Sequence, residues 1–374
     1  MKLFSTKSSY LGIDIGSAGV KIVELKNEDG RPRLLTYGFV EEKIDIIDND
    51  SEQMKNKVAG LITKICEQSR TSSAKTVAAL PSFSVFSSII SLPYMNKKEL
   101  SKAIYWQAKK FVPMDLNEMT LDWKLLDEDV WTNKKDVIKN NENKDENDPE
   151  YSGQEIQKQK NNKKNIKVLI AASPKKLVMR YIDIFKKANL DLISLETENF
   201  SLERSLIGND KSPTMIVDIG CITSDISIVE NGIPVLSRSV DVGGDSITKS
   251  VVTSMQVDEK RAEQFKRDIG FSSENSSLPK VIEGVVSPII NEIKYCFDLY
   301  ASQESNKRIE KIVLTGGSAF LPNIDEYLSK LLNIKVFVGD PWSRVIYPLE
   351  LKSVLNDLAP RFSVAVGLAM REIV

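Results

Sequence analysis

Two aspartates in this sequence stand in matching surroundings that suit phosphate chemistry. Asp14 and Asp218 each lie in an apolar run, and each is followed two residues later by a glycine, Gly16 or Gly220. A glycine in a short turn lets backbone N–H groups approach an anion closely, and a carboxylate beside it can hold a hydrated magnesium ion. The pattern predicts sites for nucleotide phosphates, with Asp14 and Asp218 as magnesium ligands.

Each aspartate sits in a segment that predicts a β-hairpin with a short polar turn. Ser17 and Thr223 add hydroxyl donors for phosphate, and Ala18 and Lys21 complete the candidates in the first hairpin. For one segment alone, an ordinary hairpin with a polar tip is the simpler interpretation, because a single glycine motif is weak. Two matching copies favour phosphate binding and indicate two related lobes, each opening with the same hairpin.

A third segment, 311–320, predicts a buried strand that runs into a pair of glycines. The order hairpin, hairpin, strand with glycine pair is the order that a nucleotide clamped between two lobes requires. The further candidates for nucleotide binding are small residues in predicted turns: Gly243, Gly244, Gly316, Gly317 and Ser318.

The composition excludes several classes of function. The chain of 374 residues contains no histidine, so Ser-His-Asp catalysis, Cys-His catalysis and His-ligated metals are excluded. A net charge of -1 lacks the basic excess of a nucleic-acid surface, so no nucleic-acid partner is expected. Three widely separated cysteines, Cys66, Cys221 and Cys296, argue against a disulfide framework and favour a reducing cytosol. No apolar run reaches the roughly 18 residues that a membrane span needs.

The region between the hairpins predicts a small α+β unit. A helix is expected over 96–111, with a capping box at Asn96 and Glu99 and with Phe111 on its inward face. Strands are expected on either side of a polar run, about 127–165, that is rich in Asn, Lys, Glu and Asp. Because this run has few apolar groups, we expect a flexible surface loop there.

Two later helices carry expectations of their own. The apolar period over 322–332 places Leu331 on the inward face. Within the apolar stretch 281–300, Pro288 is expected to interrupt the helix, because proline lacks the N–H that continues it.

The three glycine segments resemble the two phosphate motifs and the adenosine motif of the actin-like ATPase superfamily. The resemblance implies an α/β fold of two lobes with duplicated sheet-and-helix subdomains, and ATP or ADP with Mg²⁺ as ligands. Glu263 and Lys266 resemble the pair that contacts ribose and base, with a solvated surface ion pair as the equal alternative. Glu198 resembles the catalytic glutamate that orients the attacking water, with a helix-start carboxylate as the alternative.

The segments 99–113, 121–123 and 364–371 resemble the PilM family of this superfamily, which assembles type IV pili. The resemblance implies a scaffold in the cytoplasm that reaches the inner membrane through a partner. That partner would be the N-terminal cytoplasmic tail of a PilN-like protein, bound in a groove that involves 82–93 and 173–188. Other pilus assembly components are further expected partners, in pilus, secretion or competence machinery.

The residues leave the rate of ATP hydrolysis and the choice between two functions open. Ile222 stands where hydrolytic relatives usually have a second glycine, so at most slow ATPase activity is expected. A self-polymerising, FtsA-like cytoskeletal ATPase is the alternative function, because one fold supports both uses.

The expected division is a first lobe with a small inserted α+β subdomain and then a second lobe, with these parts in order: 1–86, 87–172 (inserted), 173–211, 212–340 (second lobe) and 341–374 (return to the first lobe).

Overall fold

The structure is a computed structural model, and it describes residues 8–112, 114–126, 165–272, 278–303 and 308–374. The chain divides into two compact units, one made of Met1–Ser84 with Met179–Val374 and the other of Val85–Val178. The subdomain expected over 87–172 falls within the second unit. The loop expected over about 127–165 lies outside the described residues, apart from residue 165.

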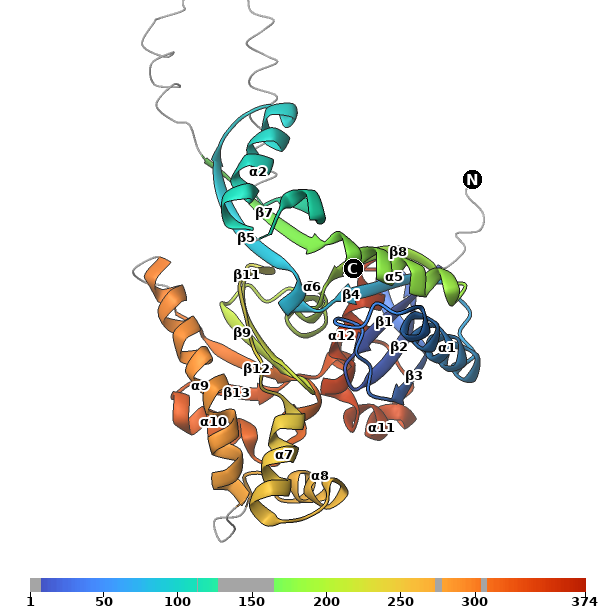
Figure 1. Ribbon diagram of the computed structural model, residues 1–374, viewed down its shortest axis with the longest axis vertical. Coiled ribbons are helices and arrows are strands. Elements are labelled where there is room, and N and C mark those ends of the chain that lie inside the picture. Colours follow the sequence, from blue (N-terminus) through green and yellow to red (C-terminus); the bar gives the residue numbers. More distant parts are fainter. Residues whose placement is uncertain (1–7, 113, 127–164, 273–277, 304–307) are drawn as a thin grey trace, which may run out of the picture. The chain divides into compact units, whose positions relative to one another are not determined.

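The first sheet of the larger unit opens with an antiparallel hairpin and continues with parallel strands (Figure 1). The central strands consist largely of apolar residues because both of their faces are covered. The strand order is β3-β2-β1-β4-β8, with bounds β1 Ser9–Gly16, β2 Gly19–Glu28, β3 Arg31–Glu41, β4 Lys75–Leu80 and β8 Asp191–Thr197.

The second sheet repeats this topology strand for strand. Its central hairpin is again antiparallel, and its last two strands are again parallel to the first strand of the hairpin or to each other. The order is β11-β10-β9-β12-β13, with bounds β9 Thr214–Ile219, β10 Ser224–Glu230, β11 Ile233–Val240, β12 Lys311–Thr315 and β13 Lys335–Val338. The two-lobed fold with duplicated subdomains, predicted from the matching hairpins, is confirmed.

The helix α12 (Ala359–Met370) packs against both sheets of this unit. Every residue of α12 except Arg361 is buried, as expected for a helix that is apolar on nearly all sides. Val364 and Leu368 of α12 pack with Val77 of β4 and Val313 of β12 in a single apolar cluster. The helices of the unit are α1 Glu52–Ser69, α5 Lys175–Lys187 (its first residues belong to the smaller unit), α6 Glu198–Leu202, α7 Gly244–Met255, α8 Glu259–Asp268, α9 Leu278–Gln303, α10 Ile324–Leu332, α11 Lys352–Asn356 and α12 Ala359–Met370.

In its described residues, the smaller unit is a three-stranded antiparallel sheet with α2 (Lys97–Phe111) packed against it. Asn96 caps this helix by accepting a hydrogen bond from the Glu99 amide, as predicted. Leu100 and Ile104 form the buried stripe that packs on the sheet. The sheet order is β5-β7-β6, with bounds β5 Phe86–Pro93, β6 Met119–Leu125 and β7 Asn165–Pro174.

Three local expectations are wrong, two about side chains at helix ends and one about a proline. Phe111 is 52% exposed, because the chain leaves α2 there and Val112 takes the next buried position. Leu331 is 45% exposed, because the last turn of the nine-residue α10 turns Leu332 toward the core instead.

Pro288 does not interrupt the helix: α9 runs unbroken from Leu278 to Gln303. A proline inside a helix costs about 3 kcal/mol. The apolar stripe that continues across it, including Ile282, Val286 and Ile289, is buried in the core of the second lobe. Packing of that stripe offsets the local cost, since each fully buried aliphatic side chain contributes about 1.5–3 kcal/mol.

Candidate functional site

The first hairpin pairs its aspartate with a cation. The β1–β2 register places Asp14 opposite Lys21, and Lys21 Nζ lies 2.8 Å from Asp14 Oδ2. Asp14 is buried, and the two residues of the turn are Ser17 and Ala18. The carboxylate therefore has its countercharge within its own hairpin, at a distance that makes a charge-assisted hydrogen bond.

The second hairpin pairs its aspartate with another aspartate. The β9–β10 register places Asp218 opposite Asp225, which accepts a hydrogen bond from the Ser239 hydroxyl. Burial, together with the charges of Asp225 and Asp14 and against the opposing effect of Lys21, raises the pKa of Asp218 to about 7. Burial also raises the pKa of Asp225 to about 6. This hairpin carries an excess of negative charge.

Asp225 was missed at the level of sequence, although a signal for it exists. Lys21 and Asp225 each stand seven residues after the aspartate of their hairpin. Since the two hairpins are copies, this spacing places Lys21 opposite Asp14 and Asp225 opposite Asp218, each on the neighbouring strand.

Glu198 adds a carboxylate from a different element. It is the first residue of α6, directly after β8, and its Oε2 accepts a hydrogen bond from the Ser82 amide at 2.8 Å. Burial raises the pKa of Glu198 well above its usual range, and Asp225, Asp14 and Asp218 raise it further. Glu198 is thus a helix-start carboxylate, as one of the two alternatives expects, and it lies in electrostatic range of the aspartates of both hairpins.

Two buried hydroxyl groups lie in the same neighbourhood without a hydrogen-bond partner among the described residues, Ser82 Oγ and Tyr181 OH. Tyr181 is fully buried on α5; burial raises the pKa of its phenol, as do the charges of Glu198 and Asp14. Buried polar groups almost always find a partner, and ordered water supplies it where protein does not. The region beside Glu198 is therefore suited to hold water.

These carboxylates suit a hydrated magnesium ion better than a bare one. Among the described residues, no group of three or more Asp, Glu, Cys or His side chains is close enough to hold a metal ion by itself. Magnesium commonly keeps several water ligands and binds one or two carboxylates together with substrate phosphates. Asp14 and Asp218, with Asp225 and Glu198 in electrostatic range, are a donor set of that kind.

The predicted glycines provide close packing around the second hairpin. Gly316 has a φ of 85°, and a side chain there would collide with Asp218 Oδ1. A side chain at Gly243 would lie 2.5 Å from the carbonyl oxygen of Cys221. The Gly244 amide donates to the Gly220 carbonyl at 2.9 Å, so the start of α7 is fastened to the hairpin tip.

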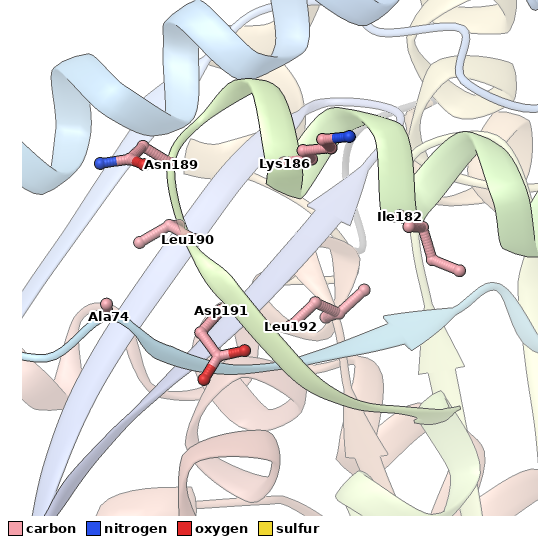
Figure 2. Close-up of a pocket in the computed structure, with 7 residues that line it drawn as sticks. All are labelled: Ala74, Ile182, Lys186, Asn189, Leu190, Asp191 and Leu192. Carbon is pink, nitrogen blue, oxygen red and sulfur yellow. The ribbon is translucent and has the colours of Figure 1, made fainter.

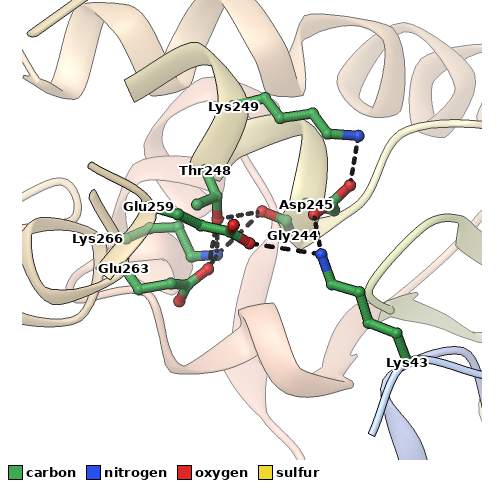
Figure 3. Close-up of polar contacts among 8 residues, drawn as sticks. All are labelled: Lys43, Gly244, Asp245, Thr248, Lys249, Glu259, Glu263 and Lys266. Carbon is green, nitrogen blue, oxygen red and sulfur yellow. Dashed lines mark hydrogen bonds and ion pairs between the residues drawn. The ribbon is translucent and has the colours of Figure 1, made fainter. Parts of the chain in front are cut away.

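Figure 3 shows the polar cluster that links α7 and α8. Lys266 Nζ donates to the Gly244 carbonyl at 3.0 Å, to Thr248 Oγ1 at 2.8 Å and to Glu263 Oε1 at 2.7 Å. Lys266 is buried, so the alternative of a solvated surface pair is wrong for this residue. Ser318 lies nearby, since a side chain on Gly244 would reach within 2.7 Å of its Oγ. The cluster brings Gly244, Glu263, Lys266 and Ser318 together.

A lysine that sequence reasoning missed bridges the two lobes. Lys43, in the segment after β3, lies 3.6 Å from Asp245 of α7 and 3.4 Å from Glu259 of α8 (Figure 3). The Asp245 and Glu259 charges raise the pKa of Lys43. No spacing in the sequence could have found this contact, because it joins residues about 200 positions apart.

The remaining candidates lie at the edges of this site. Ala18 is exposed at the tip of the first hairpin, and Ile222 is 54% exposed at the tip of the second. Gly317 opens a short 3-10 turn after β12, with open space around it. A separate pocket between α5, the turn after it and β8 contains none of the predicted nucleotide-binding residues, although Ile182 and Lys186 belong to the segment 173–188 expected at the partner groove. It is lined by Ala74, Ile182, Lys186, Asn189, Leu190, Asp191 and Leu192 (Figure 2).

Two lobes with duplicated sheets, each presenting an aspartate hairpin, define a protein of the actin-like class. A solved structure titled "PilM-PilN type IV pilus biogenesis complex" superposes with a TM-score of 0.78 at 21% identity, over 98% of this chain and 99% of the other. The ethanolamine utilization protein EutJ from Carboxydothermus hydrogenoformans superposes with a TM-score of 0.54 at 15% identity, over 97% of this chain and 89% of the other. These likenesses establish the fold.

Residues 12–148 and 150–373 match the family described as type IV pilus assembly protein PilM, and the chain belongs to this family. FtsA of Neisseria meningitidis serogroup B is 28% identical over 180 residues, which is 41% of this chain and 41% of FtsA. MreB of Escherichia coli K12 is 25% identical over 168 residues, which is 35% of this chain and 47% of MreB. The chain thus matches less than half the length of these curated relatives. In the described residues, no helix is long and apolar enough to cross a membrane.

Proposed function

We propose that this protein binds ATP or ADP with magnesium between its two lobes. We propose further that it acts as a scaffold of type IV pilus or related assembly machinery. The observation that carries the nucleotide proposal is the gathering of Asp218, Asp225 and Glu198, whose pKa values are raised by burial, beside Asp14, whose charge raises the pKa of Asp218 and of Glu198 further. A fold that gathers like charges in this way has a place for a cation and its anionic ligand.

Each part of the site would have a definite task in such a complex. Asp14 and Asp218 would hold the water ligands of the magnesium ion, and Lys21 would face the phosphates. The turns at Gly16 and Gly220 would offer backbone N–H groups. Magnesium would supply positive charge to the phosphate oxygens. A solved structure titled as MreB 5 of Spiroplasma citri bound to AMPPNP supports this proposal, with a TM-score of 0.50.

The adenosine end of the nucleotide would lie against the cluster of α7 and α8. The ammonium group of Lys266 already donates three hydrogen bonds, to Gly244, Thr248 and Glu263. It would therefore position Glu263, which is partly exposed, as the contact to the ribose. Gly316, Gly317 and Ser318 would line the opposite side.

Turnover is expected to be slow. Burial and the neighbouring carboxylates raise the pKa of Glu198 and so favour its protonated form, which cannot accept a proton from water. Ser82 and Tyr181 would hold the water that it orients. A steady-state phosphate release well below about 1 per second is the expected result. A faster release that is lost in Glu198→Gln would show an efficient enzyme instead.

The proposed partner is the cytoplasmic N-terminal tail of a PilN-like inner-membrane protein. Membership of the PilM family and the likeness to the PilM–PilN complex support this assignment. The proposed contact segments are 82–93 and 173–188, the two stretches that join the smaller unit to the rest of the chain. Binding of a synthetic tail peptide with a simple 1:1 isotherm would support the scaffold.

A self-polymerising ATPase is the second candidate. A structure titled "MamK double helical filament" superposes with a TM-score of 0.52 at 11% identity, over 96% of this chain and 97% of the other. Light scattering separates the two functions in one sample. A scaffold stays small with ATP and binds the peptide, whereas a filament protein ignores the peptide and grows through an interface that does not close.

The nucleotide site can be tested through a native cysteine. Cys221 is partly exposed at the tip of the second hairpin, and Cys66, partly exposed on α1, provides an internal control. Burial raises the pKa of both thiols, so alkylation is run at alkaline pH. ATP with magnesium should slow the alkylation of Cys221 and leave that of Cys66 unchanged. Equal rates at Cys221 with and without ATP would contradict the site.

A further inference from the structure

The face of α2 that points away from its own sheet carries exposed aromatic side chains among lysines. Trp106 is 62% exposed and Tyr105 is 42% exposed, and their rings meet edge to face at 6.0 Å between centroids. Lys109 Nζ lies 5.6 Å from the centroid of the Trp106 ring. The α2 patch is this pair of aromatic residues together with four exposed lysines on the same helix: Lys98, Lys102, Lys109 and Lys110.

The needs of the fold do not account for the α2 patch. The stripe that packs α2 onto its sheet, Leu100, Ile104 and Ala108, lies on the other side of the helix and is fully buried. Trp106 takes no part in that core. Lys98 stands in the first turn, where a positive charge opposes the helix dipole instead of complementing it. Lys109 and Lys110 lie in the last turn, where positive charge is favourable, so the unexplained features are Lys98 and the exposed Trp106, which indicate a surface that is kept for a ligand.

The chemistry of the α2 patch selects an anionic lipid surface. The outer side of a single helix is convex, whereas peptide segments usually dock in grooves. Protein interfaces are depleted in lysine at their cores. Tryptophan and tyrosine with lysine are the residues that helices use at the headgroup level of a bilayer, and each lysine near an anionic leaflet adds favourable charge attraction.

We propose that the α2 patch binds the anionic headgroup surface of a phospholipid bilayer, with Trp106 and Tyr105 at the headgroup level and the lysines against the phosphates. The argument for a membrane over another anionic surface rests on the proposed function, since a partner anchored in the inner membrane brings this chain close to its leaflet. The contact is an addition to attachment through the partner. Because the lysines supply most of the attraction, it weakens with salt.

The test uses the full chain with neither nucleotide nor partner peptide, so that its failure is separate from failure of the proposed function. The protein is sedimented with vesicles of phosphatidylcholine alone or of phosphatidylcholine with about one-third phosphatidylglycerol. The variants are Lys109→Glu with Lys110→Glu, and Trp106→Ala. Lys330→Glu, on α10 and 81% exposed, is the control for the change of charge. Melting curves check that each variant folds.

The expected result is salt-sensitive binding to the anionic vesicles and none to the neutral ones. The double lysine variant should lose about tenfold or more in binding, Trp106→Ala a smaller factor, and Lys330→Glu nothing. Absence of binding at low salt, or equal loss in Lys330→Glu, would overturn the proposal. If the vesicles are ignored while soluble polyglutamate quenches Trp106 fluorescence, the α2 patch serves an acidic protein and the lipid assignment is wrong.

Discussion

The two hairpins of this protein are copies in backbone and opposites in charge. In the first, the residue across the strand from the aspartate is Lys21, 2.8 Å from Asp14. In the second, the equivalent residue is Asp225, opposite Asp218. One hairpin is neutral within itself, and the other gathers negative charge that burial makes expensive.

This difference in charge suggests that the two hairpins contact different parts of a ligand. In the proposed complex, Lys21 of the first hairpin would face the phosphates, and the second hairpin would bring most of the carboxylate charge to the metal ion. A ligand that carries both charges, such as a nucleotide with magnesium, satisfies the two hairpins together. Both hairpins would contact this ligand, so ligand binding would favour the arrangement of lobes that brings them together.

The largest expected effect comes from removing the metal-facing charge of the second hairpin. Asp218→Asn keeps the shape of the side chain but removes the charge, so magnesium-dependent affinity for ATP should fall about 10- to 100-fold. Calorimetric titration with ATP and magnesium measures this loss. Asp210→Asn, a change of the same type on an exposed turn, is the matched control. Unchanged affinity in Asp218→Asn would place the metal elsewhere.

Two further substitutions each remove the charged side chain that lies opposite the aspartate of its hairpin. Asp225→Asn removes the like charge opposite Asp218 and should raise the melting temperature of the ligand-free protein. Lys21→Met leaves Asp14 without its partner and should lower that temperature. Shifts of about 2–4 °C in opposite directions are expected, each corresponding to about 1 kcal/mol. Shifts of the same sign would show that the charges across the strands do not govern stability.

The stability of the ligand-free protein should depend on pH through the second hairpin. The folded pKa values of Asp218 and Asp225, about 7 and about 6, lie above the value of about 4 for an unfolded aspartate. The folded state therefore binds more protons than the unfolded state between these values. These two groups make the protein less stable as the pH rises from about 4 to about 7, and the full loss is present above that range.

Denaturant unfolding at a series of pH values measures this slope, and Asp218→Asn should flatten it. Magnesium with ATP should restore stability mainly at the alkaline end, where both carboxylates are charged. A slope that Asp218→Asn leaves unchanged would mean that other groups cause it.

The smallest effect is expected at the bridge between the lobes. Lys43→Ala removes the contacts of Lys43 with Asp245 and Glu259, so the lobes should part more readily and nucleotide should leave faster. Because Lys43 and Glu259 are largely exposed, a change of about fivefold or less in the release rate is expected. Lys249→Ala is a close control, since Lys249 pairs with the same Asp245 from within α7 at 2.6 Å. Equal effects of both changes would exclude a role for the bridge.

The parts of the site that repeat in the sequence were predictable, and the parts that depend on tertiary contacts were not. Asp14 and Asp218 could be found because strand period, turn glycine and duplication agree at both positions. Lys43 could not be found from the sequence, because tertiary contacts with α5 hold its segment in place. Arg180 of α5 donates to Asp50 Oδ1 at 2.8 Å and to the Ile47 carbonyl at 2.7 Å.

The errors in the fold have a similar origin. Phe111 and Leu331 have the right period for burial, but each lies in the last turn of its helix, where the chain leaves the core. Pro288 has the right chemistry to end a helix, but the packing of the stripe around it in α9 outweighs that local preference. A periodic pattern shows which face is apolar, and only the tertiary structure shows how far the core extends along it.

The most direct test of the account is the melting temperature of the wild-type protein with ATP in the presence of magnesium and in the presence of a chelator. If the two hairpins hold a nucleotide through a metal ion, magnesium with ATP should stabilise the fold by about 2.7 kcal/mol at a concentration 100 times the dissociation constant. ATP with the chelator should stabilise it far less, because the carboxylates of the second hairpin then repel the phosphates. No shift at millimolar ATP with magnesium, or an equal shift with the chelator, would contradict the account.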